Sequence, residues 1–246
     1  MSQLSDKNIP VNERLIVALD NANVVEAQEL VITLGDTVSF YKLGLSLIFD
    51  NGYWGLFDWL VKSGKKAFAD VKVYDIPETV QASISKLVGR GASFVTVHAH
   101  DKMIQAAVRG RGKHTELKIL AVTLLTSLDS GDLKGMGFPQ VDVKQLVLDR
   151  ARRMLEAGCD GVISSGLEVQ SLRGECGNNF LIVVPGIRPV DNERERRDDQ
   201  KRVVDLETAF TNGADYVVVG RPIRQATDPR AAAEHFQARV ARVFGN

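Results

Sequence analysis

The segment FADVKVYDIPETV, residues 68–80, joins an apolar run to a group of charged residues and then to a helix-like sequence. Its first part belongs to KAFADVK (66–72), which we predict to be a buried strand. Because strand side chains alternate between two faces, Asp70 and Lys72 are expected on the same face. Asp75 follows at the start of the next predicted helix. Opposite charges are costly to bury unless paired, which favours a functional site, although a solvated strand end with a helix cap is the alternative.

Seven further runs have the same apolar character, and amphipathic helical patterns such as 141–158 and 228–245 lie between them. Near-continuous apolar runs are typical of parallel strands covered on both faces. The predicted strands are LIVALD (15–20), VSFYKLG (38–44), FVTVHAH (94–100), KILAVTLL (118–125), GVISS (161–165), LIVVPG (181–186) and YVVVG (216–220).

Eight strand–helix units in 246 residues predict an α/β fold, a (β/α)8 TIM barrel that forms one domain over residues 1–246. Residues 1–12 are expected to be a short N-terminal extension. A doubly wound open sheet is the competing architecture, but that fold usually has a glycine-rich turn after its first strand. Here the first strand ends in LDNAN, so the barrel is favoured.

The active site of such a barrel lies at the carboxyl ends of its strands. Charged or hydroxyl side chains stand at most of the predicted ends, including Asp20, Lys42, Asp70, Lys72, His98, Thr126 and Ser127. Any one of them taken alone could be an ordinary strand-end residue. Gathered around one mouth, they predict a site.

Two features near the end of the chain indicate phosphate binding. Gly220 and Arg221 follow the last predicted strand, where backbone N–H groups and a guanidinium could bind an anion. A capping glycine beside a surface arginine is the alternative. The densely charged segment 188–201 follows the seventh strand and is expected to be an active-site lid, although a solvated loop is the usual fate of such a run.

Composition narrows the partners. Lys+Arg and Asp+Glu both number 31, so the net charge is zero and we expect neither a nucleic-acid nor a membrane partner. The N-terminus lacks the apolar region of a signal peptide, which predicts a cytoplasmic protein. Cys159 and Cys176 are the only cysteines, too few for a disulfide framework or a zinc site. No cofactor motif appears in the sequence, and we expect no cofactor and no metal.

Four segments together, DVKVYDIPETV, LAVTLLTS, VVPGIRP and DYVVVGRPI, resemble the orotidine 5′-monophosphate decarboxylase family. The resemblance extends over nearly the whole chain. The D-x-K-x-x-D pattern is shared with sugar-phosphate decarboxylases and synthases of the same superfamily, and the I-P-x-T, LTS and PGIRP elements narrow it. Glu78 departs from the family, which usually has Asn there. The resemblance implies cofactor-free conversion of orotidine 5′-monophosphate to uridine 5′-monophosphate and carbon dioxide, the last step of de novo UMP synthesis, by a homodimer.

The resemblance also implies roles for individual residues. Lys42, Asp70, Lys72 and the partner subunit's Asp75 would form an alternating charge network, with Lys72 as the proton donor to C6 of the pyrimidine. Asp75 and Thr79 would reach across the dimer. The substrate-binding residues implied are Asp20, Lys42, Asp70, Thr79, Thr126, Ser127, Arg188, Gln200, Gly220 and Arg221.

Two other functions fit part of the pattern. A sister enzyme of the superfamily would act on a sugar phosphate through an Mg²⁺-stabilised enediolate, with the carboxylates as metal ligands. A non-catalytic barrel that only binds a nucleotide or sugar phosphate would need the phosphate residues without the charge network. Sensitivity to EDTA separates the first of these from a decarboxylase of the orotidine type.

Overall fold

The computed structural model describes residues 4–21, 23–138, 140–187 and 202–245. Within these ranges eight strands form a closed, all-parallel barrel in chain order, because the first strand pairs with both the second and the last. The predicted single-domain TIM barrel is therefore confirmed. Its strands are β1 (Leu15–Leu19), β2 (Phe40–Gly44), β3 (Lys66–Val73), β4 (Phe94–His98), β5 (Lys118–Val122), β6 (Gly161–Ile163), β7 (Leu181–Val184) and β8 (Tyr216–Val219).

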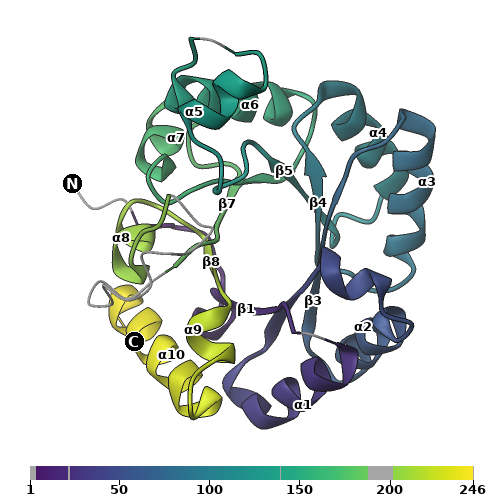
Figure 1. The fold of residues 1–246 in the computed structure, drawn as a ribbon, viewed down its shortest axis with the longest axis vertical. Coiled ribbons are helices and arrows are strands. Elements are labelled where there is room, and N and C mark those ends of the chain that lie inside the picture. Colours follow the sequence, from purple (N-terminus) through teal and green to yellow (C-terminus); the bar gives the residue numbers. More distant parts are fainter. Residues whose placement is uncertain (1–3, 22, 139, 188–201, 246) are drawn as a thin grey trace.

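Helices surround the barrel as an outer ring, which Figure 1 shows in a view into the barrel. None of the described helices combines the length and apolar character needed to cross a membrane. The α-helices are α1 (Val24–Leu34), α2 (Tyr53–Lys62), α3 (Pro77–Val88), α4 (Asp101–Arg111), α5 (Ser130–Gly135), α6 (Val143–Glu156), α7 (Val169–Cys176), α8 (Leu206–Thr211), α9 (Arg221–Arg224) and α10 (Pro229–Phe244). Short 3₁₀ helices are η1 (Val11–Glu13), η2 (Gly35–Thr37) and η3 (Leu45–Phe49).

Aromatic rings fill the interior of the barrel. The ring centroid of Phe94 lies 4.9 Å from that of Phe40, 5.7 Å from that of Phe68 and 5.1 Å from that of Tyr216. All four side chains are buried, and burying a side chain of this size stabilises the fold by about 1.5–3 kcal/mol. Because side chains repeat every second residue, the positions after Phe40 and Phe68 on the same face are Lys42 and Asp70. The aromatic layer thus forms the floor beneath them.

The last part of β3 departs from the regular strand predicted for 66–72. The pairing of β3 with β4 shifts register between Ala69 and Val73, and Lys72 has a φ of 49°. A left-handed backbone is unusual for a residue with a side chain. Regular alternation therefore stops at Asp70, and a bulge rather than the strand pleat places Lys72.

Candidate active site

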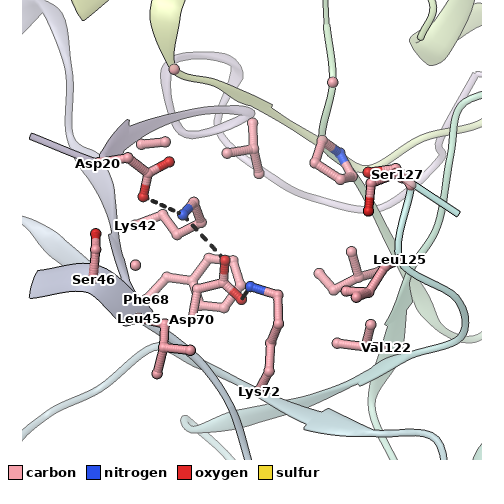
Figure 2. A pocket seen from close by; sticks show the side chains of 18 of the residues that line it. Asp20, Lys42, Leu45, Ser46, Phe68, Asp70, Lys72, Val122, Leu125 and Ser127 are labelled. Atoms are coloured by element: carbon pink, nitrogen blue, oxygen red, sulfur yellow. Dashed lines mark hydrogen bonds and ion pairs between the residues drawn. The ribbon is translucent and has the colours of Figure 1, made fainter. Parts of the chain in front are cut away.

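Four charged side chains form a row at the carboxyl end of the barrel. Nζ of Lys42 lies 3.0 Å from Oδ1 of Asp20 and 3.1 Å from Oδ2 of Asp70. Nζ of Lys72 lies 3.0 Å from Oδ1 of Asp70, so this carboxylate bridges two ammonium groups. Figure 2 shows the row, with Lys42 between the two aspartates and the Lys72 side chain rising to Asp70. The ends of β1, β2 and β3 thus bring four of the predicted site residues together.

The ion pair between Lys42 and Asp70 is held in its charged form. Burial alone raises the pKa of Asp70, but the ammonium groups of Lys42 and Lys72, with hydrogen bonds from Lys72 and Thr96, outweigh burial and lower it to about 2. Burial lowers the pKa of Lys42, yet the carboxylates of Asp70 and Asp20 leave it above its ordinary value. At neutral pH Asp70 is therefore anionic and Lys42 cationic, and the Lys72 side chain is about one-third exposed at the cavity side.

A cavity of about 500 Å³ opens beside this row. Its wall opposite the charges comes from the loop after β5, where Leu125 and Ser127 lie across the pocket from Lys42 in Figure 2. Thr126 also lines the cavity and is buried. Gly220 and Arg221, at the end of β8 and the start of α9, line the cavity as the phosphate prediction requires.

Three predicted residues of the described chain, Asp75, Thr79 and His98, do not line this cavity. Asp75 and Thr79 are exposed, outside the pocket, and Oδ1 of Asp75 accepts a hydrogen bond from the backbone N–H of Ile76 at 2.7 Å. Their assignment across a dimer stays a prediction, because a single chain does not test it. Arg188 and Gln200, like the expected lid over 188–201, lie outside the described residues.

Sequence reasoning missed three residues of the site. Thr96 is fully buried on β4, and its hydroxyl donates to Oδ1 of Asp70 at 2.9 Å. Gly44 leaves the space that the Asp20 carboxylate occupies. Arg224 lines the cavity one turn after Arg221, and its Nε is buried without a hydrogen-bond partner in the described residues. Of the three, only Thr96 could have been predicted from the sequence, because strand alternation places it on the same inward face as His98, two residues later.

Comparison with known proteins identifies the family of this chain. The family model "Orotidine 5′-phosphate decarboxylase / HUMPS family" matches residues 13–236. The chain belongs to this family. The orotidine 5′-phosphate decarboxylase of Methylococcus capsulatus is 56% identical over 98% of this chain and 97% of its own length. That of Nitrobacter winogradskyi is 48% identical over 90% of each chain.

A solved structure supports the family assignment. The crystal structure of orotidine 5′-phosphate decarboxylase from Lactobacillus acidophilus superposes with a TM-score of 0.80 at 35% identity, over 93% of this chain and 99% of that one. The resemblance inferred from the sequence motifs is therefore confirmed at the level of the family.

Across the described residues, no three His, Cys, Asp or Glu side chains form a group that could hold a metal ion.

Proposed function

We propose that this chain decarboxylates orotidine 5′-monophosphate to uridine 5′-monophosphate and carbon dioxide in UMP biosynthesis, with Lys72 stabilising the developing charge and protonating C6. The observation that carries the proposal is the Lys42–Asp70–Lys72 row at the mouth of a barrel of this family. The identity of 56% to a curated decarboxylase over nearly the whole chain supports the choice of substrate.

The chemistry requires a fixed positive group. When carbon dioxide leaves C6, the electron pair remains in an sp² orbital that the π system of the ring cannot take up. Stabilisation is then electrostatic, from a charge that is already oriented where the negative charge develops. The Lys72 ammonium, held 3.0 Å from Asp70 at the cavity edge, is such a group and also carries the proton that C6 needs.

The remaining residues divide the substrate between them. We assign Asp20 and Lys42 to the ribose, and Thr126 and Ser127 to the pyrimidine on the opposite wall. We assign the phosphate to the end of the cavity lined by Gly220 and Arg221, where Arg224 adds a second guanidinium. Arg188 and Gln200 stay proposed phosphate ligands from the segment outside the described residues. Phosphate contacts far from C6 supply binding energy that orders the site for the chemical step.

Asp75 and Thr79 complete the proposal as residues that one protomer contributes to its partner's site. Both are exposed at the start of α3. The apolar side chains of Tyr74 and Ile76 beside them are also more than 60% exposed, at 67% and 63%. Exposed apolar residues next to polar groups of this kind favour a protein interface. A homodimer formed through this region would bring Asp75 towards the row of charges.

The magnesium-dependent alternative has weaker support in the geometry. In that enzyme Asp70 would be a metal ligand, yet both of its carboxylate oxygens already contact cationic groups, and Oδ1 also accepts from Thr96. Asp20 likewise has one oxygen on Lys42. An ammonium on each side of a carboxylate competes directly with a divalent cation for the same oxygens.

The deciding experiment is the ultraviolet absorbance of orotidine 5′-monophosphate mixed with the purified protein in EDTA. We expect loss of the orotate chromophore together with formation of uridine 5′-monophosphate. The Lys72→Ala variant, purified identically, controls for a contaminating host enzyme. A folded wild-type protein that leaves the absorbance unchanged in EDTA, and acts on a sugar phosphate when Mg²⁺ is added, would overturn the proposal.

A further inference from the structure

Thr96 has an unusual environment for a threonine in the middle of a barrel strand. Its side chain is fully buried on the inward face of β4, and both hydrogen-bonding functions of its hydroxyl are in use. The hydroxyl donates to Oδ1 of Asp70 at 2.9 Å and accepts the backbone N–H of Lys72 at 3.0 Å. One side chain therefore contacts the carboxylate of one proposed catalytic residue and the backbone of the other.

The strand pairing explains why such a group is needed there. Ala69 pairs with Val95 and Val73 pairs with Val97, so three residues of β3 stand opposite the single residue Thr96 of β4. A bulge of this kind removes backbone groups from the regular ladder. The Lys72 N–H, which would otherwise be left without a strand partner, is satisfied by the threonine hydroxyl instead.

The bulge also carries a conformational cost. The left-handed backbone of Lys72, with a φ of 49°, is disfavoured for a residue with a Cβ, because the Cβ crowds the following carbonyl oxygen. Such a conformation persists only where its surroundings hold it in place. The hydrogen bond to Thr96 is the contact that the structure provides for the Lys72 N–H.

We infer that Thr96 is a positioning residue that fixes the Asp70 carboxylate and the bulged backbone of Lys72 in one arrangement. The inference rests on the proposed function, because it concerns how the proton donor of that reaction is aimed. The Asp70 carboxylate orients the Lys72 ammonium through their 3.0 Å contact. Loss of the hydroxyl would release both the carboxylate and the lysine backbone, and the ammonium would no longer be held against C6.

A hydroxyl suits this position because it donates and accepts at the same time. Valine has nearly the shape of threonine and can do neither. Serine keeps the hydroxyl and lacks only the methyl group. The pair Thr96→Val and Thr96→Ser therefore separates the hydrogen bonds from the packing of the side chain.

Thr123, the residue directly after β5, offers a matched control. It is also fully buried, and its hydroxyl donates to the backbone carbonyl of Ile163 at 3.0 Å, away from the charge row. Thr123→Val thus removes one buried hydroxyl hydrogen bond without touching Asp70 or Lys72. Any loss of stability that comes from removing a buried hydroxyl in general is expected in both valine variants, whereas a loss of kcat is expected in Thr96→Val.

The experiment measures kcat and KM for orotidine 5′-monophosphate and, without substrate, hydrogen exchange at the Lys72 amide. Misplacement of a reacting group by about 1 Å costs about 10²-fold in rate. We therefore expect Thr96→Val to lose about that factor in kcat with little change in KM, and Thr96→Ser to stay within about tenfold of wild type. The Lys72 amide should exchange at least tenfold faster in Thr96→Val only.

Two outcomes would overturn the inference. One is a folded Thr96→Val protein with wild-type kcat and unchanged Lys72 exchange, and the other is equal losses in the valine and serine variants. If Thr96→Val does not fold, Thr96→Cys replaces it, and a thiol variant as active as the serine variant contradicts the role of the hydroxyl. The exchange measurement needs no substrate, so it decides the inference even if the proposed reaction is wrong.

Discussion

Gly44 shows at the scale of one residue how the charge row depends on a missing side chain. A β-carbon at this position would lie 2.2 Å from Oδ1 of Asp20 and 3.3 Å from Nζ of Lys42. The backbone of Gly44, with a φ of −78°, is one that any residue adopts, so the glycine is needed for space alone. Its absent side chain is what lets Asp20 reach Lys42.

We predict that Gly44→Ala displaces the Asp20 carboxylate and breaks its ion pair with Lys42. Steady-state kinetics should show kcat/KM lower by about tenfold, equivalent to about 1.4 kcal/mol, chiefly through KM if Asp20 binds the ribose. Gly55→Ala is the matched control, because a β-carbon there meets no atom within 4 Å. A Gly44→Ala enzyme with the kinetics of Gly55→Ala would contradict the argument.

Asp70 gives a prediction about pH and stability. Its folded pKa of about 2 lies below the unfolded value of about 3.9, so its stabilising contribution is fully present above about pH 4 and is lost as the pH falls through about 2. Asp70→Asn lacks this contribution. The difference in unfolding free energy between wild type and Asp70→Asn should be constant above about pH 4 and should narrow by roughly 2–3 kcal/mol as the pH falls through about 2. Urea titrations across this range measure it, and a constant difference would refute the low pKa of Asp70.

At the scale of elements, the loop after β5 is held by two arginines from outside the strand. Arg150 donates to the carbonyl of Thr123 at 2.7 Å, and Arg202 donates to that of Leu125 at 3.2 Å. Arg202 is itself buried in an ion pair with Glu168, at 2.7 Å. This loop forms the wall of the cavity that faces the charges, so its anchoring affects both stability and the site.

Glu168→Gln should therefore destabilise the fold by about 3 kcal/mol, because it leaves the buried Arg202 guanidinium without a counter-charge. We also expect a lower kcat/KM, because Arg202 would no longer be held in place to donate to the Leu125 carbonyl in the cavity wall. Glu175→Gln is the control, since its pair with Arg152 is nearly half exposed and is worth less than about 1 kcal/mol. Equal unfolding midpoints for the two variants in urea would show that burial of the Glu168 pair is not what stabilises the loop.

The elements also show what the sequence could and could not predict. Eight apolar runs were sufficient for the barrel, but several predicted strands extend past their true ends: the run 118–125 contains β5, which stops at Val122. Leu124 and Leu125 are apolar because they line the cavity, and hydrophobic pattern alone does not separate such residues from strand residues. Lys42, Asp70 and Lys72 were found because charges are rare in apolar runs. Thr96 was missed because threonine is common in strands and its partners lie on another strand.

At the scale of the molecule, the two ends of the barrel have different tasks. Asp215 lies just before β8, at the amino end, and is fully buried with Arg173 at 2.7 Å. Its carboxylate also accepts from the Ile182 N–H and from the side chains of Ser5 and Lys7. In TIM barrels this face serves stability while the opposite face carries the chemistry.

Asp215→Asn should accordingly lower the unfolding free energy by about 3–5 kcal/mol, because Arg173 stays buried without its counter-charge. The kcat and KM of the folded fraction, measured well below the unfolding temperature, should equal those of wild type. Thermal unfolding and steady-state kinetics on one preparation test both halves. A changed kcat in fully folded protein would show that the amino end is coupled to the site.

Shared sites in a homodimer would allow two inactive variants to complement each other. If each site takes Lys72 from one protomer and Asp75 from its partner, Lys72→Ala and Asp75→Ala homodimers should both be inactive. After mixing and reassociation, half of the dimers would be heterodimers with one intact site, so about a quarter of wild-type activity should return. A mixture of Lys72→Ala with Lys42→Ala is the control, because both residues lie on one chain, in contact with the same Asp70, and every site stays incomplete. Mixed dimers seen by native mass spectrometry without recovered activity would place Asp75 outside the partner's site.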